Sequence, residues 1–335
     1  MNTTGYPAAV VERAVAAAVR APSLHNSQPW RFRLTGAGIE VRIDRGRPLP
    51  AVGHGHLGDW AAQLACGGAV FNLRIALAVE GLPARVRLRP YPTEPDVVAL
   101  LEPDEPRPPS PAERELFAAI PRRHSSRQPF FTEPVPGEVR WRLVLAARVE
   151  GAWLELVVGT TAVEALGQLA HSANRVLERD PGYRTEIARW TRQEPAADGV
   201  PARAGGPVAE PQDLLPQRPF GDQLRMPGRD FEPEPLVAVL GSAADSAVDR
   251  ITAGQALQRV LLTATDAGLA ASMMSQPIEV PAARDRLRTA LGRFGTPQMV
   301  MRIGYGQPGW PTPRRDVADV IDHDDAAVAA AGTAG

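Results

Sequence analysis

A run of prolines between residues 103 and 111 places the strongest limit on how this chain of 335 residues can fold. The prolines are Pro103, Pro106, Pro108, Pro109 and Pro111. Proline lacks a backbone N–H group and its ring fixes φ, so neither a helix interior nor a central strand can continue through such a run. The sequence therefore predicts two units, over residues 1–110 and 111–335, on either side of a linker.

Hydrophobic periodicity predicts both helices and strands in each unit. Residues 1–110 are expected to hold a helix over 7–19, a hairpin with strands near 30–34 and 39–43, a helix over 59–80, and strands near 84–89 and 96–101. Residues 111–335 are expected to hold helices over 112–120, 137–148, 161–179, 247–267 and 281–291, and strands over 152–158, 236–241 and 298–304. The predicted fold class is α+β.

Residues 194–235 differ from the rest of the chain because they are rich in proline and glycine and poor in apolar side chains. A long segment of this kind inside a compact chain is either disordered or a functional lid, and composition leaves both interpretations open. The polar residues 272–277, between two predicted helices, are expected to form a loop. Residues 323–335, rich in alanine, are expected to be a flexible tail.

The segment from Arg20 to Phe32 is a candidate binding loop. Pro22 and Pro29 each disfavour helical backbone at the preceding residue, so the first helix must stop before this loop. Hydroxyl, imidazole and carboxamide groups then follow closely in Ser23, His25, Asn26 and Gln28. Such a mixture of donors and acceptors suits a flat heterocycle edged with carbonyl groups and ring nitrogens.

A second candidate segment, Arg123-His-Ser-Ser-Arg127, combines arginine and hydroxyl side chains after a predicted helix. Forked guanidinium donors with hydroxyl support are the groups that a doubly charged phosphate prefers. The alternative is a solvated basic surface, and a phosphate site is the favoured interpretation.

Charge and residue usage exclude several classes of function. The formal net charge is -1, which argues against a general electrostatic hold on nucleic acid or an anionic membrane. All 37 basic residues are arginine, so lysine-dependent Schiff-base and P-loop mechanisms cannot operate. The single cysteine, Cys66, forms no intrachain disulfide and is expected to be buried. The chain shows no signal peptide or long apolar run, so a cytoplasmic protein is expected.

A rival motif lies at Gly53-His-Gly-His-Leu-Gly58, which has the GxGxxG spacing of dinucleotide-binding proteins. Pro48 and Pro50 make the preceding residues a poor central strand, so the context argues against that interpretation. His54 and His56 could bind a metal, but no third histidine is nearby in sequence, and a surface turn is favoured.

Four segments together resemble the FMN-dependent nitroreductase superfamily. Ala21–Trp30 resembles its APSxxNxQPW segment and Arg123–Arg127 its RHSxR phosphate segment, while Gly268–Pro277 resembles the loop beside the flavin and Pro313–Arg315 the final basic segment. The resemblance implies FMN as the cofactor. The residues it implies as cofactor-binding are Pro22, Ser23, His25, Asn26, Gln28, Arg123, His124, Ser125, Arg127, Ser275, Gln276, Arg314 and Arg315.

The order of these segments is similar to that of the Acg-type branch, whose single chains imitate a nitroreductase dimer. The resemblance implies two fused, pseudo-symmetric halves with one FMN site, a lid over 194–235, and a monomer or weak homodimer. It implies hydride transfer from NADPH or NADH through FMN to a small acceptor by a ping-pong mechanism. Two alternatives stay open: a protein that sequesters FMN under the lid, and a duplicate that binds no flavin and serves as an interaction scaffold.

Overall fold

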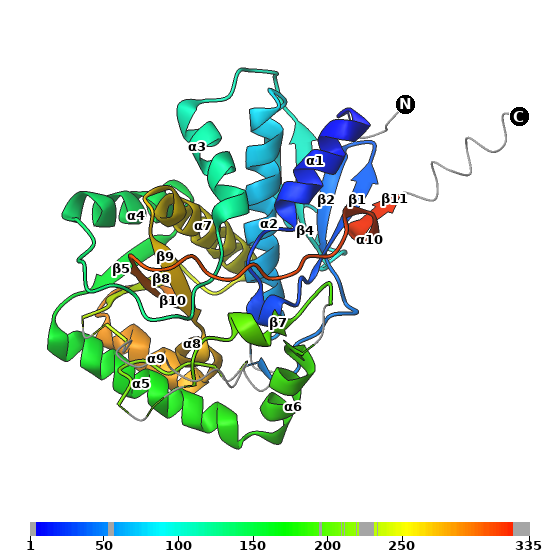
Figure 1. The fold of residues 1–335 in the computed structure, drawn as a ribbon. Coiled ribbons are helices and arrows are strands. Elements are labelled where there is room, and N and C mark those ends of the chain that lie inside the picture. The colour runs from blue at the N-terminus through cyan, green and yellow to red at the C-terminus, as the bar shows by residue number, and fades with distance from the viewer. Residues whose placement is uncertain are drawn as a thin grey trace, which may run out of the picture.

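The computed structural model describes residues 5–52, 57–193, 196–208, 210, 212–218, 220, 231–232 and 234–323. Gly53 to His56, the first part of the GxGxxG motif, lie outside the described residues, as do the acidic residues 324–325 and the rest of the predicted tail. The fold contains two main sheets with helices packed on them, and α2 (Trp60–Val79) runs through the middle of the molecule (Figure 1).

The first sheet has the strand order β11-β1-β2-β4-β3. The hairpin of β1 (Trp30–Thr35) and β2 (Gly38–Ile43) forms as predicted, because alternate side chains of β1 are buried. Antiparallel β4 (Val97–Pro103) and β3 (Ala84–Leu88) extend it. The apolar faces of α1 (Ala8–Ala18) and α2 share one hydrophobic core with these strands.

The remaining strand of this sheet comes from the far end of the described chain. After α10 (Val317–Val320), β11 (Ile321–His323) pairs in parallel with β1, and Phe32 lies opposite Ile321. The sheet of the first unit is therefore completed by the last residues of the second unit.

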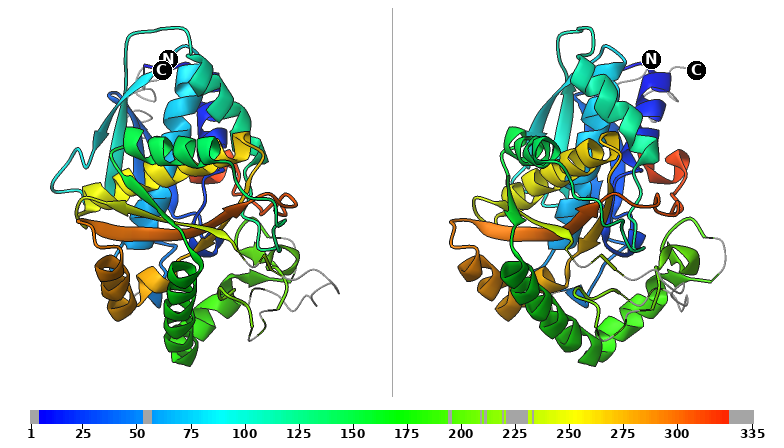
Figure 2. Two further views of the ribbon diagram at one scale, coloured as in Figure 1. Left: turned by 90° about the vertical axis from the view of Figure 1, so that its left-hand side faces the viewer. Right: turned by 60° about the vertical axis from the view of Figure 1, so that its left-hand side comes forward.

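The second sheet has the order β5-β8-β10-β9, and all its pairs are antiparallel. Its strands are β5 (Trp153–Val157), β8 (Leu236–Ser242), β9 (Ala270–Met274) and β10 (Thr296–Gly304). Helices α4 (Gly137–Val149) and α7 (Ala247–Asp266) lie on one face, and α5 (Thr160–Arg179) and α9 (Pro281–Ala290) on the other (Figure 2). Covering on both faces explains why every residue of β8 is buried.

Helices α2 and α7 connect the two layered units. They cross at Gly67 and Gly254, where the missing side chains let the two backbones meet. Helix α2 is long and apolar enough to cross a membrane, but 83% of its most apolar stretch of 18 residues is buried inside the protein. Its apolar character is therefore explained by its place in the core.

The structure corrects two sequence predictions of local structure and confirms the helix predicted after the linker. Residues 272–274, predicted as a loop, belong to β9, because pairing with β10 satisfies their backbone groups. A helix that was not predicted, α6 (Pro181–Trp190), begins where the Asp180 side chain accepts the Gly182 N–H. The linker ends in α3 (Pro111–Ala119), which starts at a capping box formed by Ser110 and Glu113.

Several short elements complete the fold, and two of them, η4 (Ala202–Ala204) and β7 (Val200–Pro201), lie in the segment predicted as a lid or a disordered region. The 3-10 helices η1 (Leu24–Asn26), η3 (Ile120–Arg122) and η4 are single turns. Strands β6 (Thr191–Arg192) and β7 form a small parallel pair, and α8 (Gln276–Glu279) follows β9. The described part of residues 194–235 thus contains η4 and β7 and is otherwise irregular.

Candidate functional site

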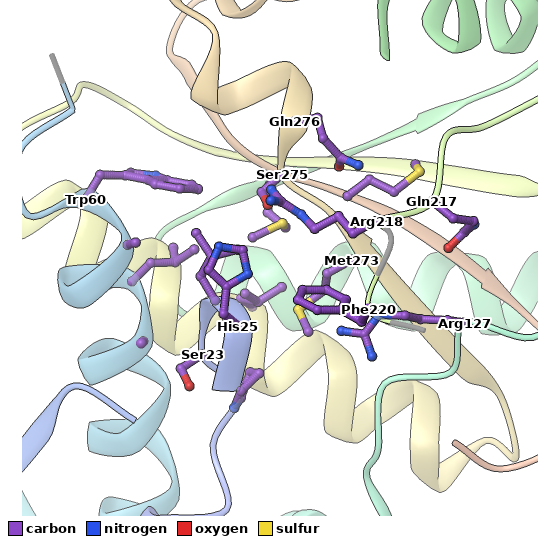
Figure 3. A pocket seen from close by; sticks show the side chains of 18 of the residues that line it. Ser23, His25, Trp60, Arg127, Gln217, Arg218, Phe220, Met273, Ser275 and Gln276 are labelled. Carbon is purple, nitrogen blue, oxygen red and sulfur yellow. The ribbon is translucent and has the colours of Figure 1, made fainter. Parts of the chain in front are cut away.

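A pocket beside α2, α7 and β9 collects many of the predicted site residues. The space between its lining atoms is about 720 Å³, with adjoining open solvent included. Its walls are apolar side chains, and polar groups enter from the loop 22–25, from Arg127, from the segment 216–218 and from the end of β9. Figure 3 shows Ser23, His25, Trp60, Arg127, Arg218, Phe220 and Gln276 arranged around this space.

The binding loop reaches the pocket through an unusual backbone path. His25, Asn26 and Gln28 have φ angles of 55°, 54° and 51°, in the left-handed region that non-glycine residues seldom adopt. The hydroxyl of Ser23 stabilises this path by accepting the backbone N–H of Gln28 at 2.9 Å. Leu24 and His25 line the pocket, whereas Asn26 and Gln28 do not.

Asn26 and Gln28 bind protein groups instead of lining the pocket. The Asn26 amide donates to the carbonyl groups of Gly199 and Pro313 at 2.9 and 3.0 Å, and its oxygen accepts from Arg314. The Gln28 amide donates to Ala197, and its oxygen accepts the backbone N–H of Arg315. These two side chains, predicted to face a ligand, tie the loop to residues 197–199 and 313–315 in this structure.

A cluster of positive groups lies directly next to the pocket. The guanidinium groups of Arg123 and Arg314 both donate to the carbonyl oxygen of Arg20, at 3.2 and 3.4 Å. Two nitrogens of Arg123 and one of Arg314 are buried without a hydrogen-bond partner among the described residues. Within the described part of the chain, neither arginine forms an ion pair with a carboxylate, so the cluster carries uncompensated charge.

The pKa values of the cluster reflect this lack of compensation. Burial lowers the pKa of Arg123 to about 10. Burial, together with Arg123 and Arg20, lowers the pKa of Arg314 to about 9. The same causes, burial first, lower the pKa of His124 to about 4. Both arginines stay positively charged at neutral pH, because their pKa values lie above 7, whereas His124 is neutral. An anion bound among the three groups would raise all three pKa values.

Other predicted residues lie at different places. Arg315 pairs with Asp44 at 3.0 Å and donates to carbonyl groups of the loop, so Arg314 and not Arg315 joins Arg123. Ser125 bridges to Ala271 beside β9, and Pro22 lines the pocket. Ser275 and Gln276 line the pocket, as predicted from the resemblance, and the side-chain oxygen of Gln276 is buried without a partner.

Two residues of the irregular segment 194–235, Arg218 and Phe220, close one side of the pocket. Arg218 ion-pairs with buried Glu279 and donates to the hydroxyls of Tyr183 and Ser275. The Phe220 ring lies 5.6 Å from His25 in an edge-on arrangement and 5.0 Å from the Arg127 guanidinium. Arg127 itself donates to the carbonyl of Ala204. Side chains of the segment predicted as a lid therefore lie inside the pocket.

The remaining candidates do not form a second reactive centre. The Cys66 thiol is buried and contacts the carbonyl oxygen of Pro29 at 3.3 Å, and burial raises its pKa. Among the described residues, no group of three or more His, Cys, Asp or Glu side chains is arranged to hold a metal ion. The pocket and the cation cluster are joined by residues 20–23 of one loop and form a single site.

Comparison with known proteins adds the family. The chain is 34% identical to "Putative NAD(P)H nitroreductase Rv3131" of Mycobacterium tuberculosis over 333 residues, which covers 96% of this chain and 94% of the relative. It is 30% identical to "Putative NAD(P)H nitroreductase acg" of the same species, which covers 93% of this chain and 95% of that protein. This chain belongs to the nitroreductase family. No protein-family model matches it.

Among the solved structures, nitroreductases align with part of the chain. The alignment with NfnB from Mycobacterium smegmatis, solved in complex with NADPH, covers 63% of this chain and 98% of NfnB, with 18% identity and a TM-score of 0.40. A nitroreductase from Bacteroides fragilis with bound FMN covers 60% with 14% identity and a TM-score of 0.38. These two relatives confirm the resemblance to Acg-type nitroreductases. The helices and mostly antiparallel sheets of the structure confirm the predicted α+β fold class.

Sequence analysis missed several pocket residues of this nitroreductase. Trp60 was placed in a predicted helix without a role, and Arg218, Phe220 and Glu186 were not singled out. Arg218 and Phe220 lie in an irregular segment, where hydrophobic periodicity cannot indicate which side chains face a pocket. The only indication in the sequence is that a charged and an aromatic side chain occur close together in a region poor in large side chains. Glu186 belongs to α6, whose start at Asp180-Pro181 has the signature of a capped helix.

Proposed function

We propose that this protein is an FMN-dependent NAD(P)H oxidoreductase. The observation that carries the proposal is the pair formed by buried Arg123 and half-buried Arg314, which have no carboxylate partner among the described residues and bind the start of the loop that lines an apolar pocket. Burying an unpaired charge is costly, and a phosphate dianion would remove that cost by accepting charge-assisted hydrogen bonds. The name of each relative as an NAD(P)H nitroreductase supports the same activity.

The residues present fit FMN in both charge and shape. Arg123 and Arg314 would hold its phosphate, with His124 at the edge of the cluster. The apolar side chains of Trp60 and Met273 would lie against its ring system, and the free oxygen of Gln276 would accept a hydrogen bond from its edge. When bound, FMN supplies the hydride chemistry, accepting electrons from NADPH or NADH and passing them to a small acceptor in a ping-pong cycle.

The chain's own residues would orient the ring and set the local field. Arg127 is positively charged, lines the pocket and has no ion pair with a described carboxylate. Its charge would stabilise negative charge that develops on a bound ligand during reduction. Phe220 and Arg218 would exclude water, which strengthens that electrostatic effect.

We also propose that the two units are pseudo-symmetric halves that together imitate a dimer. The crossing of α2 and α7 at a pair of glycines supports this, and so does the single site built from the loop of the first unit and Arg123, Arg127 and Arg314 of the second. The expected assembly is a monomer or a weak homodimer in the cytoplasm.

A second function is favoured by one observation. Arg218 and Phe220 line the pocket, where Glu279, Ser275 and Tyr183 bind Arg218 and the Phe220 ring lies against His25 and Arg127, so residues 194–235 would act as a lid over bound flavin. If that lid does not open to a nicotinamide, the protein would sequester FMN without turnover.

An absorbance spectrum of the purified protein, followed by anaerobic addition of NADPH or NADH, tests these functions. A flavin spectrum that bleaches with either nucleotide is the result expected for an oxidoreductase. A flavin that stays oxidised with both nucleotides but bleaches with dithionite would favour sequestration. Protein that takes up no FMN after incubation with an excess would contradict both proposals.

A further inference from the structure

His25 is a buried residue whose ring nitrogens contribute no hydrogen bond to the described part of the fold. Its side chain is fully buried, and neither ring nitrogen has a hydrogen-bond partner among the described residues. The residue is held at a φ of 55°, so the loop backbone is kept in an uncommon conformation that directs this ring into the pocket (Figure 3). Orphaned polar atoms in a buried position require an explanation, because burial without partners is costly.

Glu186 of α6 is the nearest acidic group to this ring. Its Oε1 atom lies 3.5 Å from His25 Nε2 and makes no hydrogen bond, while Oε2 accepts the Ala51 N–H at 3.0 Å. The carboxyl is thus anchored by one oxygen and presents the other to the imidazole. Hydrogen bonds of catalytic pairs are often long before a ligand binds, so a separation of 3.5 Å suits a pair that tightens in the complex.

Burial favours the uncharged forms of both groups. Burial, followed by Arg218 and Arg127 and against the opposing effect of Glu279, lowers the pKa of His25 to about 3. Burial raises the pKa of Glu186, against the lowering effects of the Ala51 N–H, Arg218 and Arg189 and with a small contribution from Asp180. A neutral imidazole beside a carboxyl can accept a proton at one nitrogen while it releases another from the second.

We propose that Glu186 and His25 form a proton relay that serves an electron acceptor bound in the pocket. The inference rests on the proposed oxidoreductase function, in which NAD(P)H supplies the hydride equivalent and the acceptor is a quinone or nitroaromatic compound. The O–H bond of Glu186 breaks and an N–H bond forms at Nε2, while the N–H bond at Nδ1 breaks and an O–H bond forms on the reduced acceptor. Solvent then returns a proton to the Glu186 carboxylate.

Substitutions at both members of the pair separate this role from simple packing against Phe220. Asparagine tolerates the left-handed backbone of residue 25, so His25→Asn removes the imidazole with little strain. Glu186→Gln keeps an oxygen for the Ala51 N–H but cannot supply an acidic proton. Glu178→Gln is the matched control, because Glu178 bonds to Asn174 on α5 and does not contact His25.

Each protein is loaded with FMN, reduced with dithionite, and mixed either with benzoquinone, which takes up protons on reduction, or with ferricyanide, which does not. We expect oxidation by benzoquinone to slow by about 100-fold in His25→Asn and Glu186→Gln, in the range typical of general acid catalysis. Oxidation by ferricyanide should match that of the wild type. Wild-type rates with benzoquinone, or equal slowing with both acceptors, would overturn the relay.

A second measurement needs no turnover. In flavin-free protein, the ¹⁵N chemical shift of His25 Nε2 should follow the titration of Glu186 and should lose that dependence in Glu186→Gln. A shift that is indifferent to this substitution would overturn the relay. Failure of the proposed function gives a different result, namely wild-type protein that takes up no FMN or whose FMN is not reduced by NADPH or NADH; in the latter case the dithionite experiment still decides the relay.

Discussion

Gly67 of α2 and Gly254 of α7 face each other with nearly identical surroundings. A Cβ atom on Gly67 would lie 2.2 Å from the carbonyl oxygen of Ile251, three residues before Gly254, and one on Gly254 would lie 2.1 Å from that of Leu64, three residues before Gly67. Each would also come within 2.9 Å of the other glycine's Cα atom. This reciprocal contact has the form of a two-fold axis between the helices, and it fixes how closely the two sheets approach.

Gly67→Ala should therefore lower the free energy of unfolding, by about 1–3 kcal/mol, because the new methyl group meets rigid backbone. Gly68→Ala in the same helix is the control, since its Cβ would meet only ordinary contacts at 3.5 Å or more. That variant should be neutral or gain about 0.5–1 kcal/mol from helix propensity. Urea unfolding of both proteins measures the difference, and equal stabilities would show that the crossing is not tight.

Removal of one arginine from the cluster should raise the stability of the flavin-free protein but lower its affinity for FMN. Arg123→Met should stabilise the flavin-free protein, because it removes a buried charge that has no carboxylate partner among the described residues. The same change should weaken FMN binding by about 10-fold to 100-fold through loss of charge-assisted hydrogen bonds. Thermal unfolding and flavin fluorescence titration provide the two readouts.

Arg122→Met is the matched control for that experiment, because the neighbouring Arg122 is exposed and bonds to the carbonyl of Ala118. It should leave FMN affinity unchanged. Wild-type affinity in Arg123→Met would exclude Arg123 from the phosphate site.

The buried histidines should make the flavin-free protein sensitive to mild acid. The folded-state pKa values of His124 and His25, about 4 and about 3, lie below their ordinary value of 6.5. The unfolded chain therefore takes up protons first as the pH falls, so stability present above pH 6.5 is lost as the pH falls from 6.5 through about 4 for His124 and about 3 for His25. His124→Asn should reduce this loss, leaving the share that belongs to His25.

Inorganic phosphate offers a further check on the same cluster. An anion beside His124 would raise the pKa of that histidine, so phosphate should flatten the pH dependence of the wild type more than chloride at equal ionic strength. Phosphate should have no such effect on His124→Asn. Identical curves in the two salts would argue against an anion site.

Asp198 is expected to control release of the ligand. It pairs with Arg47 at 2.9 Å and with Arg192 at 2.6 Å, next to the residues that Asn26 and Gln28 bind. Asp198→Asn should loosen this part of the segment and speed FMN dissociation by about tenfold. Asp96→Asn, which weakens an exposed pair with Arg45, is the control and should leave the dissociation rate unchanged. Stopped-flow displacement of FMN measures both rates.

Sequence patterns predicted the parts of this protein that depend on local periodicity. The helix over 59–80, the hairpin after Trp30 and the buried strand at 236–241 form almost where expected, because each places apolar residues at the period of its element. The strand β9 was missed because its residues are short and polar in part, and only pairing with β10 makes them a strand. Tertiary contacts outweigh intrinsic propensity there.

The candidate site was predicted in composition more fully than in arrangement. The site includes Ser23, His25, Arg123 and Gln276, as predicted from the sequence. The sequence could not indicate that Asn26 and Gln28 donate hydrogen bonds to backbone carbonyl groups 173 and 169 residues away. Nor could it decide between Arg314 and Arg315, since the choice depends on Asp44 lying beside the second of them. Such pairings follow from the folded path of the chain and leave no local signal.

The parallel pairing of β11 with β1 has a consequence for biosynthesis. β1 leaves the ribosome early, but the strand that covers its free edge is made after every other strand of the described chain. An uncovered strand edge is a site for unwanted association, so the nascent first unit would remain vulnerable until translation reaches residue 323. Arg314 is also synthesised late, shortly before β11. The cofactor would therefore bind only at the stage when the first sheet can be completed.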